Sequence, residues 1–175
     1  MTPTDTPVLT LDDLSKMPQA EFATRLGAIF EHSPWIAEGA WAARPFASVD
    51  ELHAAMVSVV HAACEADRLA LIRAHPELAG KEAASGTLTH DSTNEQRGAG
   101  LDQCSAEELA RLRGLNAAYR EHFGFPFVVA VKGLSRYQIM DAIEARLQNT
   151  REAEFSTCLA EIGKIARFRL DALFS

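Results

Sequence analysis

Start signals for helices recur along the whole of this chain. In a capping box, a Ser or Thr at the N-cap accepts a hydrogen bond from the third helical N–H, and a Glu or Gln at that third position reaches back. This spacing, or a close variant of it, is present at Ser48 with Glu51, Ser92 with Glu95, Ser105 with Glu108, Ser135 with Gln138 and Asn149 with Glu152. The sequence therefore predicts an all-α fold, a single-domain bundle of about eight helices.

Prolines mark two more helix starts. Proline is tolerated in the first helical turn, so Pro18 is predicted to open one helix and Pro34 to lie just inside the next. The helix from Pro18 is predicted to carry apolar residues at helical spacing, namely Phe22, Leu26, Ile29 and Phe30. The last helix, from Asn149, is predicted to run to about Phe174.

Two segments are predicted to be non-helical. Residues 81–90 are small, polar and without pattern, so most of this segment is expected to be loop. Residues 125–131 have the composition of a strand, but the chain offers no second strand to pair with them. We therefore predict a buried extended connector over 125–131.

Composition restricts the class of partner. The chain has 47% hydrophobic and 23% charged residues, a formal net charge of -7 and a pI of about 5.3. An acidic chain is a poor partner for nucleic acid or an anionic membrane, and no apolar run approaches the ~20 residues that span a bilayer. Three cysteines far apart, Cys64, Cys104 and Cys158, are expected to be reduced thiols in a cytoplasmic protein. Residues 1–8 are predicted to be a frayed N-terminus and residues 9–175 one domain.

The segment Arg73-Ala74-His75-Pro76 ends a long apolar helical pattern abruptly. Proline pushes the preceding residue out of the α region, so His75 is expected at a helix end with extended backbone. A histidine held at a rigid corner suits proton transfer because its pKa lies near neutrality. The alternative is a histidine that only caps the helix C-terminus, where the helix dipole favours it.

An arginine interrupts the apolar stripe of the last predicted helix. The stripe steps by four and three through Phe155, Leu159, Ile162, Ala166, Arg169 and Leu173. A buried unpaired charge costs several kcal/mol, so Arg169 must be paired or must meet an anion, unless it extends from the edge of the stripe to solvent. Asn116 interrupts the stripe of the helix after Ser105 in the same way, and is predicted to tie down main chain.

Glu95 and Gln96 allow a structural and a functional interpretation. Glu95 can be the third residue of a capping box, but a helix N-terminus also offers N–H groups to a carboxylate or a polarised carbonyl. His90-Asp91 resembles the metal-binding dipeptide of helical phosphohydrolases, although this pair is expected in a loop. No other pattern competes strongly for a metal.

Together these residues give the chain a resemblance to the OHCU decarboxylase family of urate degradation, where OHCU is 2-oxo-4-hydroxy-4-carboxy-5-ureidoimidazoline. The resemblance covers nearly the whole chain. Its motifs, in order, are Phe30-Glu31-His32-Ser33-Pro34-Trp35, His75-Pro76-Glu77-Leu78-Ala79-Gly80, Ser92-x-x-Glu95-Gln96, Leu115-Asn116-x-x-Tyr119, Phe123-Gly124-Phe125-Pro126-Phe127-Val128, and Glu161-Ile162-x-Lys164-Ile165-Ala166 with Arg169-Leu170. Singly these motifs are weak, but in this order they are specific.

The resemblance implies a cofactor-free, all-helical carboxy-lyase that converts OHCU to (S)-allantoin. It assigns the catalytic proton donor to His75. We expect Glu95 to be the second catalytic residue, which either orients the imidazole or holds substrate N–H groups. It also implies substrate-binding residues, namely Pro76, Ser92, Thr93, Asn94, Glu95, Gln96, Phe127, Val128, Val129, Ala130, Val131 and Arg169. Arg146 is the alternative for the substrate arginine, and no metal ligand is implied.

The resemblance extends to form and location. Family members are often dimers, so a homodimer is expected, with a small-molecule substrate and no nucleic acid or membrane partner. The chain lacks the transthyretin-like hydrolase domain of some plant relatives and ends Leu173-Phe174-Ser175 without a peroxisomal signal, so a bacterial-type cytoplasmic enzyme is expected. The alternative functions are a metal-dependent helical phosphohydrolase and a non-catalytic helical binding module.

Overall fold

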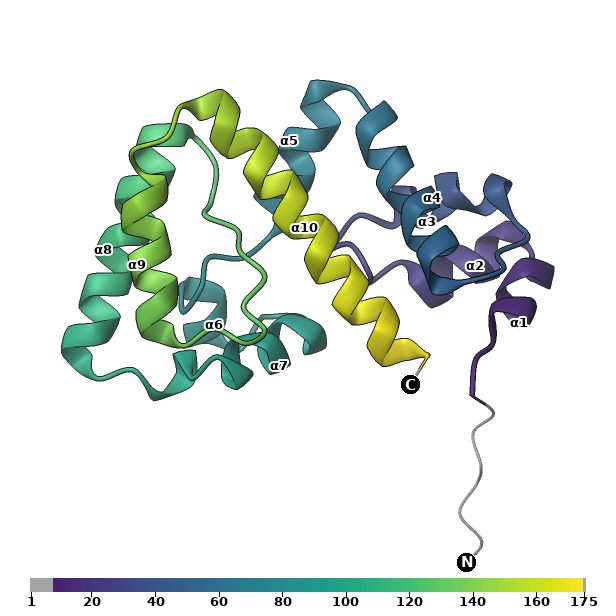
Figure 1. Cartoon of the computed structure of the whole chain (residues 1–175). Helices are drawn as coiled ribbons and strands as arrows, with labels where there is room; N and C mark the ends of the chain where they lie inside the picture. Colours follow the sequence, from purple (N-terminus) through teal and green to yellow (C-terminus); the bar gives the residue numbers. More distant parts are fainter. Residues whose placement is uncertain (1–7, 175) are drawn as a thin grey trace, which may run out of the picture. The chain divides into compact units, whose positions relative to one another are not determined.

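The computed structural model describes residues 8–174, and regular structure in that range is helical throughout (Figure 1). It contains ten α-helices, eight of them seven residues or longer, and the described residues include no strand. The prediction of an all-α chain with about eight helices is confirmed. None of these helices is both long enough and apolar enough to cross a bilayer.

Main-chain contacts divide the chain into two compact units. The first unit comprises residues 1–64 and 166–175, and the second comprises residues 65–165. The predicted frayed N-terminus falls mostly on residues 1–7, which lie outside the described residues, and Val8 is 67% exposed. The single domain over 9–175 stays a prediction.

The first unit is built from short helices that follow one another closely. Its elements are α1 (Leu11–Lys16), α2 (Gln19–Leu26), α3 (Pro34–Ala40), the 3-10 turn η1 (Trp41–Ala43), α4 (Val49–Ala62) and, from residue 166 on, the last turns of α10 (Arg151–Leu173). Helix α2 packs on α3, and α3 packs on α4. The core side chains of these helices are at most 1% exposed, and they include Leu14, Phe22, Leu26, Ile36, Leu52 and Met56.

The predicted starts in the first unit are confirmed, but one predicted end is wrong. Pro34 is in the first turn of α3, and Ser48 Oγ accepts the Glu51 N–H of α4 at 3.1 Å. Helix α2 ends at Leu26, so Ile29 and Phe30 lie beyond it although both are buried. Helical spacing in the sequence cannot distinguish a continuing helix from a buried turn.

The second unit contains the longer helices. Its elements are α5 (Glu65–Ala74), α6 (Lys81–Ser85), α7 (His90–Gly98), the 3-10 turn η2 (Leu101–Gln103), α8 (Ala106–Phe123), α9 (Arg136–Arg146) and α10 (Arg151–Leu173) as far as residue 165. The capping boxes of α8 and α9, at Ser105 and Ser135, have both of their hydrogen bonds. Gly124 ends α8 in the left-handed conformation, with a φ of 82°.

Two predicted helix starts in this unit are wrong by a few residues. Helix α7 begins at His90, because Thr89 Oγ1 accepts the Ser92 N–H at 3.3 Å, and Ser92 is therefore inside the helix. Thr150, not Asn149, caps α10 by accepting the Ala153 N–H at 3.1 Å. In both cases a neighbouring hydroxyl reaches the same turn, and residue spacing alone does not rank the two caps.

The segment predicted as loop over 81–90 is partly helical. It contains the five residues of α6 and the first residue of α7. Gly86 ends α6 with a φ of 72°, a backbone conformation that glycine adopts without steric cost. Residues 125–131 form the predicted connector, since they are non-helical, unpaired with any strand and mostly buried. We call residues 125–131 the connector below.

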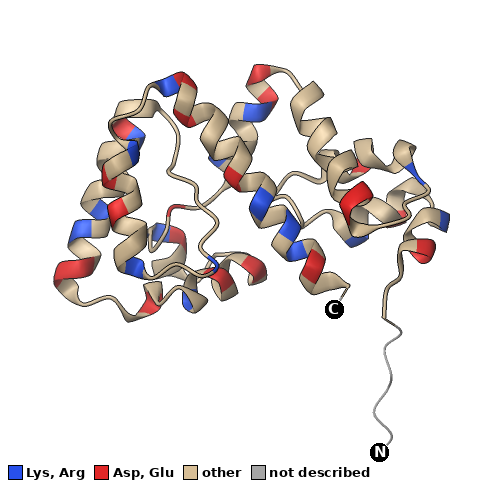
Figure 2. Ribbon diagram, in the orientation of Figure 1, with Lys and Arg blue, Asp and Glu red and all other residues tan. Residues whose placement is uncertain are grey.

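Acidic and basic residues are interspersed along α8, α9 and α10 (Figure 2). Several pair across helices, such as Arg111 of α8 with Glu144 of α9 at 2.8 Å. Exposed pairs of this kind contribute little to stability. The chain as a whole carries a formal net charge of -7.

Candidate active site

His75 lies at the C-terminal end of α5, as the His-Pro pair predicts. Its own N–H bonds to the Ile72 carbonyl at 3.2 Å, which tightens the last turn and leaves the Leu71 carbonyl to the side chain. The imidazole Nδ1 lies 2.9 Å from that carbonyl oxygen, so Nδ1 carries the proton and donates it. The residue is 7% exposed. Its ring is therefore held by its own helix, with Nε2 as the nitrogen suited to proton exchange.

A cavity of about 520 Å³ opens at this corner within the second unit. His75 and Pro76 line it together with Phe125 and Pro126 of the connector. Charged side chains complete the wall: Arg73, Glu77, Lys81, Glu82 and Arg120. The sequence thus brings a buried histidine, a rim of three basic and two acidic side chains and the start of the connector to one cavity of small-molecule size.

Both arginines on the rim, Arg73 and Arg120, are already bound to protein groups. Arg73 donates from Nε and Nη2 to the Gly124 carbonyl at 3.2 and 3.0 Å, and Arg120 pairs with Glu77. The first contact ties the end of α5 to the end of α8. The second ties α8 to the residue after Pro76. Both contacts hold the corner against α8.

The turn after Pro76 is fixed by two buried amides. Gln96 Oε1 accepts the Ala79 N–H at 2.9 Å, and Asn116 Nδ2 donates to the Leu78 carbonyl at 2.9 Å. Ala79 has a φ of 51°, a left-handed conformation that costs a non-glycine residue roughly 1–2 kcal/mol. These two bonds compensate for that strain. The prediction that Asn116 ties down main chain is confirmed.

The predicted substrate residues of α7 do not all face the same way. Ser92 and Gln96 are buried one helical turn apart, while Glu95 is half-buried. Thr93 Oγ1 donates to the Thr89 carbonyl at 2.9 Å, and exposed Asn94 contacts His90. Gln96 uses Oε1 on Ala79, so its Nε2 is the atom suited to a ligand. Thr93 and Asn94 are thus engaged locally.

The connector buries the predicted residues Phe127, Val128, Val129 and Val131, and half-buries Ala130. Over residues 8–174, the Val129 N–H donates to no protein group, although Val129 is only 8% exposed. Buried N–H groups are nearly always paired in folded proteins, so this donor is suited to a ligand. The observation supports the predicted role of the connector backbone.

Arg146 lies behind the connector in a buried polar cluster that the sequence did not reveal. Its Nε donates to Glu154 Oε1 at 2.7 Å and its Nη1 to the Val128 carbonyl at 2.8 Å. Tyr119 Oη donates to the same Glu154 oxygen at 2.6 Å, and Arg146 Nη2 lies 3.4 Å from Cys158 Sγ. The residues Tyr119, Arg146, Glu154 and Cys158 are called the Glu154 cluster below.

Burial shapes the protonation of the Glu154 cluster. It raises the pKa of Tyr119, with a further contribution from Cys158, and it raises the pKa of the Cys158 thiol. Burial lowers the pKa of Arg146, but the hydrogen bond to Glu154 and the charge interactions with Cys158, Glu154 and Tyr119 together outweigh it, and the net shift is upward. Arg146 therefore stays charged while Tyr119 and Cys158 stay neutral.

Arg169 lies in the first unit and forms a buried ion pair. Its Nη1 lies 2.9 Å from Glu31 Oε2 and also donates to the Ala28 carbonyl at 3.2 Å. Arg169 is 7% exposed and Glu31 1%. The alternative in which Arg169 extends to solvent is wrong, because the guanidinium is buried. The sequence did not identify Glu31 as the partner, since the two residues are far apart along the chain.

No described residues form a metal-binding cluster of three or more His, Cys, Asp and Glu side chains. His90 and Asp91, expected in a loop, are the first two residues of α7, and His90 contacts Asn94 at 3.1 Å. A phosphohydrolase site would need further ligands beside this pair. The pair therefore does not support the phosphohydrolase alternative.

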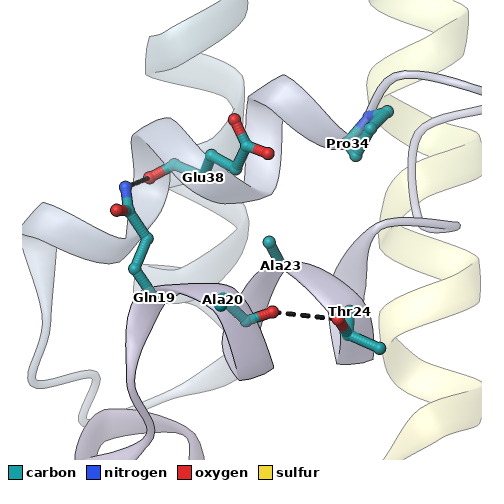
Figure 3. Close-up of a pocket in the computed structure, with 6 residues that line it drawn as sticks. All are labelled: Gln19, Ala20, Ala23, Thr24, Pro34 and Glu38. Atoms are coloured by element: carbon teal, nitrogen blue, oxygen red, sulfur yellow. Dashed lines mark hydrogen bonds between the residues drawn. The ribbon is translucent and has the colours of Figure 1, made fainter.

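A second cavity, of about 450 Å³, lies in the first unit between α2 and α3 (Figure 3). Gln19 Nε2 crosses it to the Glu38 carbonyl at 3.0 Å, and Ala20, Ala23, Thr24 and Pro34 complete its lining. None of the predicted site residues lines it. The cavity at His75 is therefore the better candidate site.

The chain matches known proteins over most of its length. A family model described as OHCU decarboxylase matches residues 15–171. The bifunctional uric acid degradation protein PucL of Bacillus subtilis is 45% identical over 163 residues, which are 93% of this chain and 32% of that protein. A 2-oxo-4-hydroxy-4-carboxy-5-ureidoimidazoline decarboxylase of Haloferax volcanii is 42% identical over 167 residues, 95% of this chain and 97% of that protein.

A solved structure gives the same result. The crystal structure of an (S)-allantoin synthase is 32% identical, with a TM-score of 0.74, and the match covers 94% of this chain and 54% of that one. The chain thus spans about a third of the PucL protein and about half of this synthase, but nearly all of the archaeal relative. The chain belongs to the OHCU decarboxylase family.

Proposed function

We propose that this protein decarboxylates OHCU to (S)-allantoin in urate degradation. The proposal is supported by membership of the family and by the activity for which the Haloferax relative is named, a protein that this chain covers almost completely. The observation that carries it is His75, a buried histidine fixed through Nδ1 at the wall of a cavity of small-molecule size. Among the proposed site residues, His75 and Pro76 line this cavity, and we place the substrate beside them. Ser92, Glu95, Gln96 and Val129 lie outside its lining.

The chemistry requires little beyond positioning and one proton. The bond from the ring to the carboxylate breaks, CO2 leaves, and the electron pair moves into the adjacent C=N, whose nitrogen takes up a proton. The enol that results loses the proton of its 4-hydroxyl and becomes a ring C=O, while a proton adds to the neighbouring ring carbon from one face and sets the configuration of the product. The net uptake is one proton. The protein must hold the carboxylate out of the ring plane and deliver that proton.

His75 is the proposed proton donor. With Nδ1 donating to the Leu71 carbonyl, the imidazolium can release its other proton only from Nε2. General acid catalysis of this kind is typically worth ~10²–10⁴-fold in rate.

Other second-unit residues are proposed to hold the substrate. Glu95 either orients Nε2 of His75 or accepts hydrogen bonds from the ureido N–H groups. Gln96 Nε2 and the Val129 N–H donate to carbonyl or carboxylate oxygens. Ser92 and Pro76 complete the surface that the ring contacts.

The proposal includes a cytoplasmic location and a homodimer. The three cysteines form no disulfide, and this supports a reducing compartment. The homodimer is carried over from the family resemblance. It concerns assembly and is independent of the assignment of His75.

We expect turnover to survive complete removal of metal, because the residues proposed to act are not a metal-ligand set. The measurement follows CO2 release from freshly prepared OHCU, with protein dialysed exhaustively against chelator and with untreated protein. Equal rates above the spontaneous reaction support the proposal. Activity that vanishes on chelation and returns with a divalent metal contradicts it and favours the phosphohydrolase-like chemistry. Absence of turnover in both samples favours the binding module.

A further inference from the structure

The connector has no strand beside it, yet its carbonyls and those just before it are bound by arginines from three helices. Arg151 of α10 donates from Nε to the Phe123 carbonyl at 3.2 Å, and Arg73 of α5 binds the Gly124 carbonyl. Arg146 of α9 donates from Nη1 to the Val128 carbonyl at 2.8 Å. Side chains thus supply the donors that a neighbouring strand would supply in a sheet.

Arg146 differs from the other two because of what surrounds it. Its guanidinium is fixed by Glu154, which is 0% exposed, and lies over the Phe127 ring at 4.3 Å from the ring centroid. Glu154 in turn accepts from Tyr119 and from Asn149 Nδ2, the latter at 2.9 Å. The donor that reaches the Val128 carbonyl is therefore held on several sides.

The geometry of the peptide unit links this contact to the substrate. In a trans peptide the C=O and the following N–H point in opposite directions within one plane. A carbonyl of Val128 that points to Arg146 therefore turns the Val129 N–H away from Arg146. Among residues 8–174, that N–H is one of several buried connector N–H groups without a protein acceptor, together with those of Phe125, Phe127 and Val131. It is the one whose direction the contact between Arg146 and the Val128 carbonyl sets.

We infer that Arg146 is a positioning residue, which holds the Val128 carbonyl and thereby aims the Val129 N–H at the substrate. The inference rests on the proposed function, in which the connector backbone contacts OHCU. Arg146 was the alternative for the substrate-binding arginine, and the structure assigns its guanidinium to the connector instead. A buried ion pair is weak evidence for a purely stabilising role, since apolar replacements are often as stable.

The test compares Arg146, which binds the Val128 carbonyl within the connector, with Arg151, which binds the Phe123 carbonyl before it. Arg146→Lys keeps a positive charge beside Glu154, but a single ammonium cannot reproduce the planar fork that binds Glu154 and Val128 together. Arg151→Lys is the matched control, because it weakens the same kind of contact at Phe123, outside 127–131. Steady-state kinetics with OHCU are measured below the melting temperature of each variant.

We expect Arg146→Lys to raise KM roughly five- to tenfold, as for the loss of one well-placed donor, with kcat changed less. Arg151→Lys should leave both constants near wild type. A wild-type KM in Arg146→Lys, or an equal rise in both variants, overturns the inference while leaving the proposed function intact. If Arg146→Lys does not fold, the charge-free pair Arg146→Met with Glu154→Gln replaces it and should raise KM similarly.

An NMR measurement that does not depend on OHCU turnover tests this inference separately from the proposed function. In ¹⁵N–¹H NMR of the whole chain, Arg146→Lys should shift the Val129 amide, and Arg151→Lys should not. If wild-type protein does not turn over OHCU, the proposed function fails, and the NMR comparison still decides the role of Arg146. An unshifted Val129 amide in Arg146→Lys overturns it.

Discussion

Replacing His75 with asparagine should lower OHCU turnover by roughly 10²–10⁴-fold while leaving the fold intact. The side-chain amide of asparagine occupies the place of Nδ1 and can still donate to the Leu71 carbonyl, which lies 2.9 Å from Nδ1 in the native protein. It has no atom at the position of Nε2. The change therefore removes the proposed proton donor and retains the bond that ends α5. Steady-state rates and thermal melting on the same samples measure the two effects.

The matched control is His90→Asn. His90 is an exposed histidine of the second unit that contacts Asn94 on its own helix. Its replacement should change neither rate nor melting temperature. A His75→Asn protein with turnover near wild type would assign the proton to another group. Loss of activity in His90→Asn alone would instead favour the His90-Asp91 dipeptide as the site.

Arg169→Met should lower the free energy of unfolding by roughly 3–5 kcal/mol, because it leaves the carboxylate of Glu31 buried without its cation. Glu31 is 1% exposed and lies 2.9 Å from the guanidinium. Denaturant unfolding monitored by circular dichroism measures the loss. The double variant Arg169→Met with Glu31→Gln removes both charges and should recover most of it. Turnover of that double variant then decides whether Arg169 also serves the substrate, as the family resemblance implies.

Arg167→Met on the same helix is the control for charge removal. Arg167 pairs with Asp50 and Asp171 but is 36% exposed, so its replacement should lower the free energy of unfolding far less than Arg169→Met does. Equal stability of Arg167→Met and Arg169→Met would refute a structural role for the buried pair. A double variant no more stable than Arg169→Met alone would show that Glu31 is not the source of the cost.

The parts of the fold predicted from sequence are those set by local interactions. The capping boxes at Ser105 and Ser135 and the glycine end of α8 depend on residues within one turn, and all three are present. The start of α7 was misplaced because Thr89 competes with Ser92 for the same turn. The connector over 125–131 was predicted because no partner strand exists.

Pairings between distant residues could not be predicted. Helical spacing indicated a buried side of α10 through Phe155 and Leu159, but these are half-buried, and Glu154 and Cys158 occupy the fully buried positions. A glutamate is expected at the surface unless partners for its charge are known. Those partners, Tyr119 and Arg146, are on other helices.

The candidate site also contains some features that the sequence predicts and others that only the structure reveals. His75 was predicted from its position before proline, and its place at a helix end is confirmed. The structure added that Gln96 and Asn116 hold the turn at Ala79. An amide in a polar segment gives no signal of which main-chain group it binds, so these contacts required the fold.

The configuration of the product tests the central claim most directly. Freshly prepared OHCU is mixed with wild-type protein, and the allantoin formed is followed by circular dichroism against a protein-free sample. Delivery of a proton by His75 to one face of the ring predicts rapid formation of (S)-allantoin in excess over the other enantiomer, and spontaneous decay alone in the His75→Asn protein. Racemic allantoin at the protein-free rate from the wild-type protein would contradict the account.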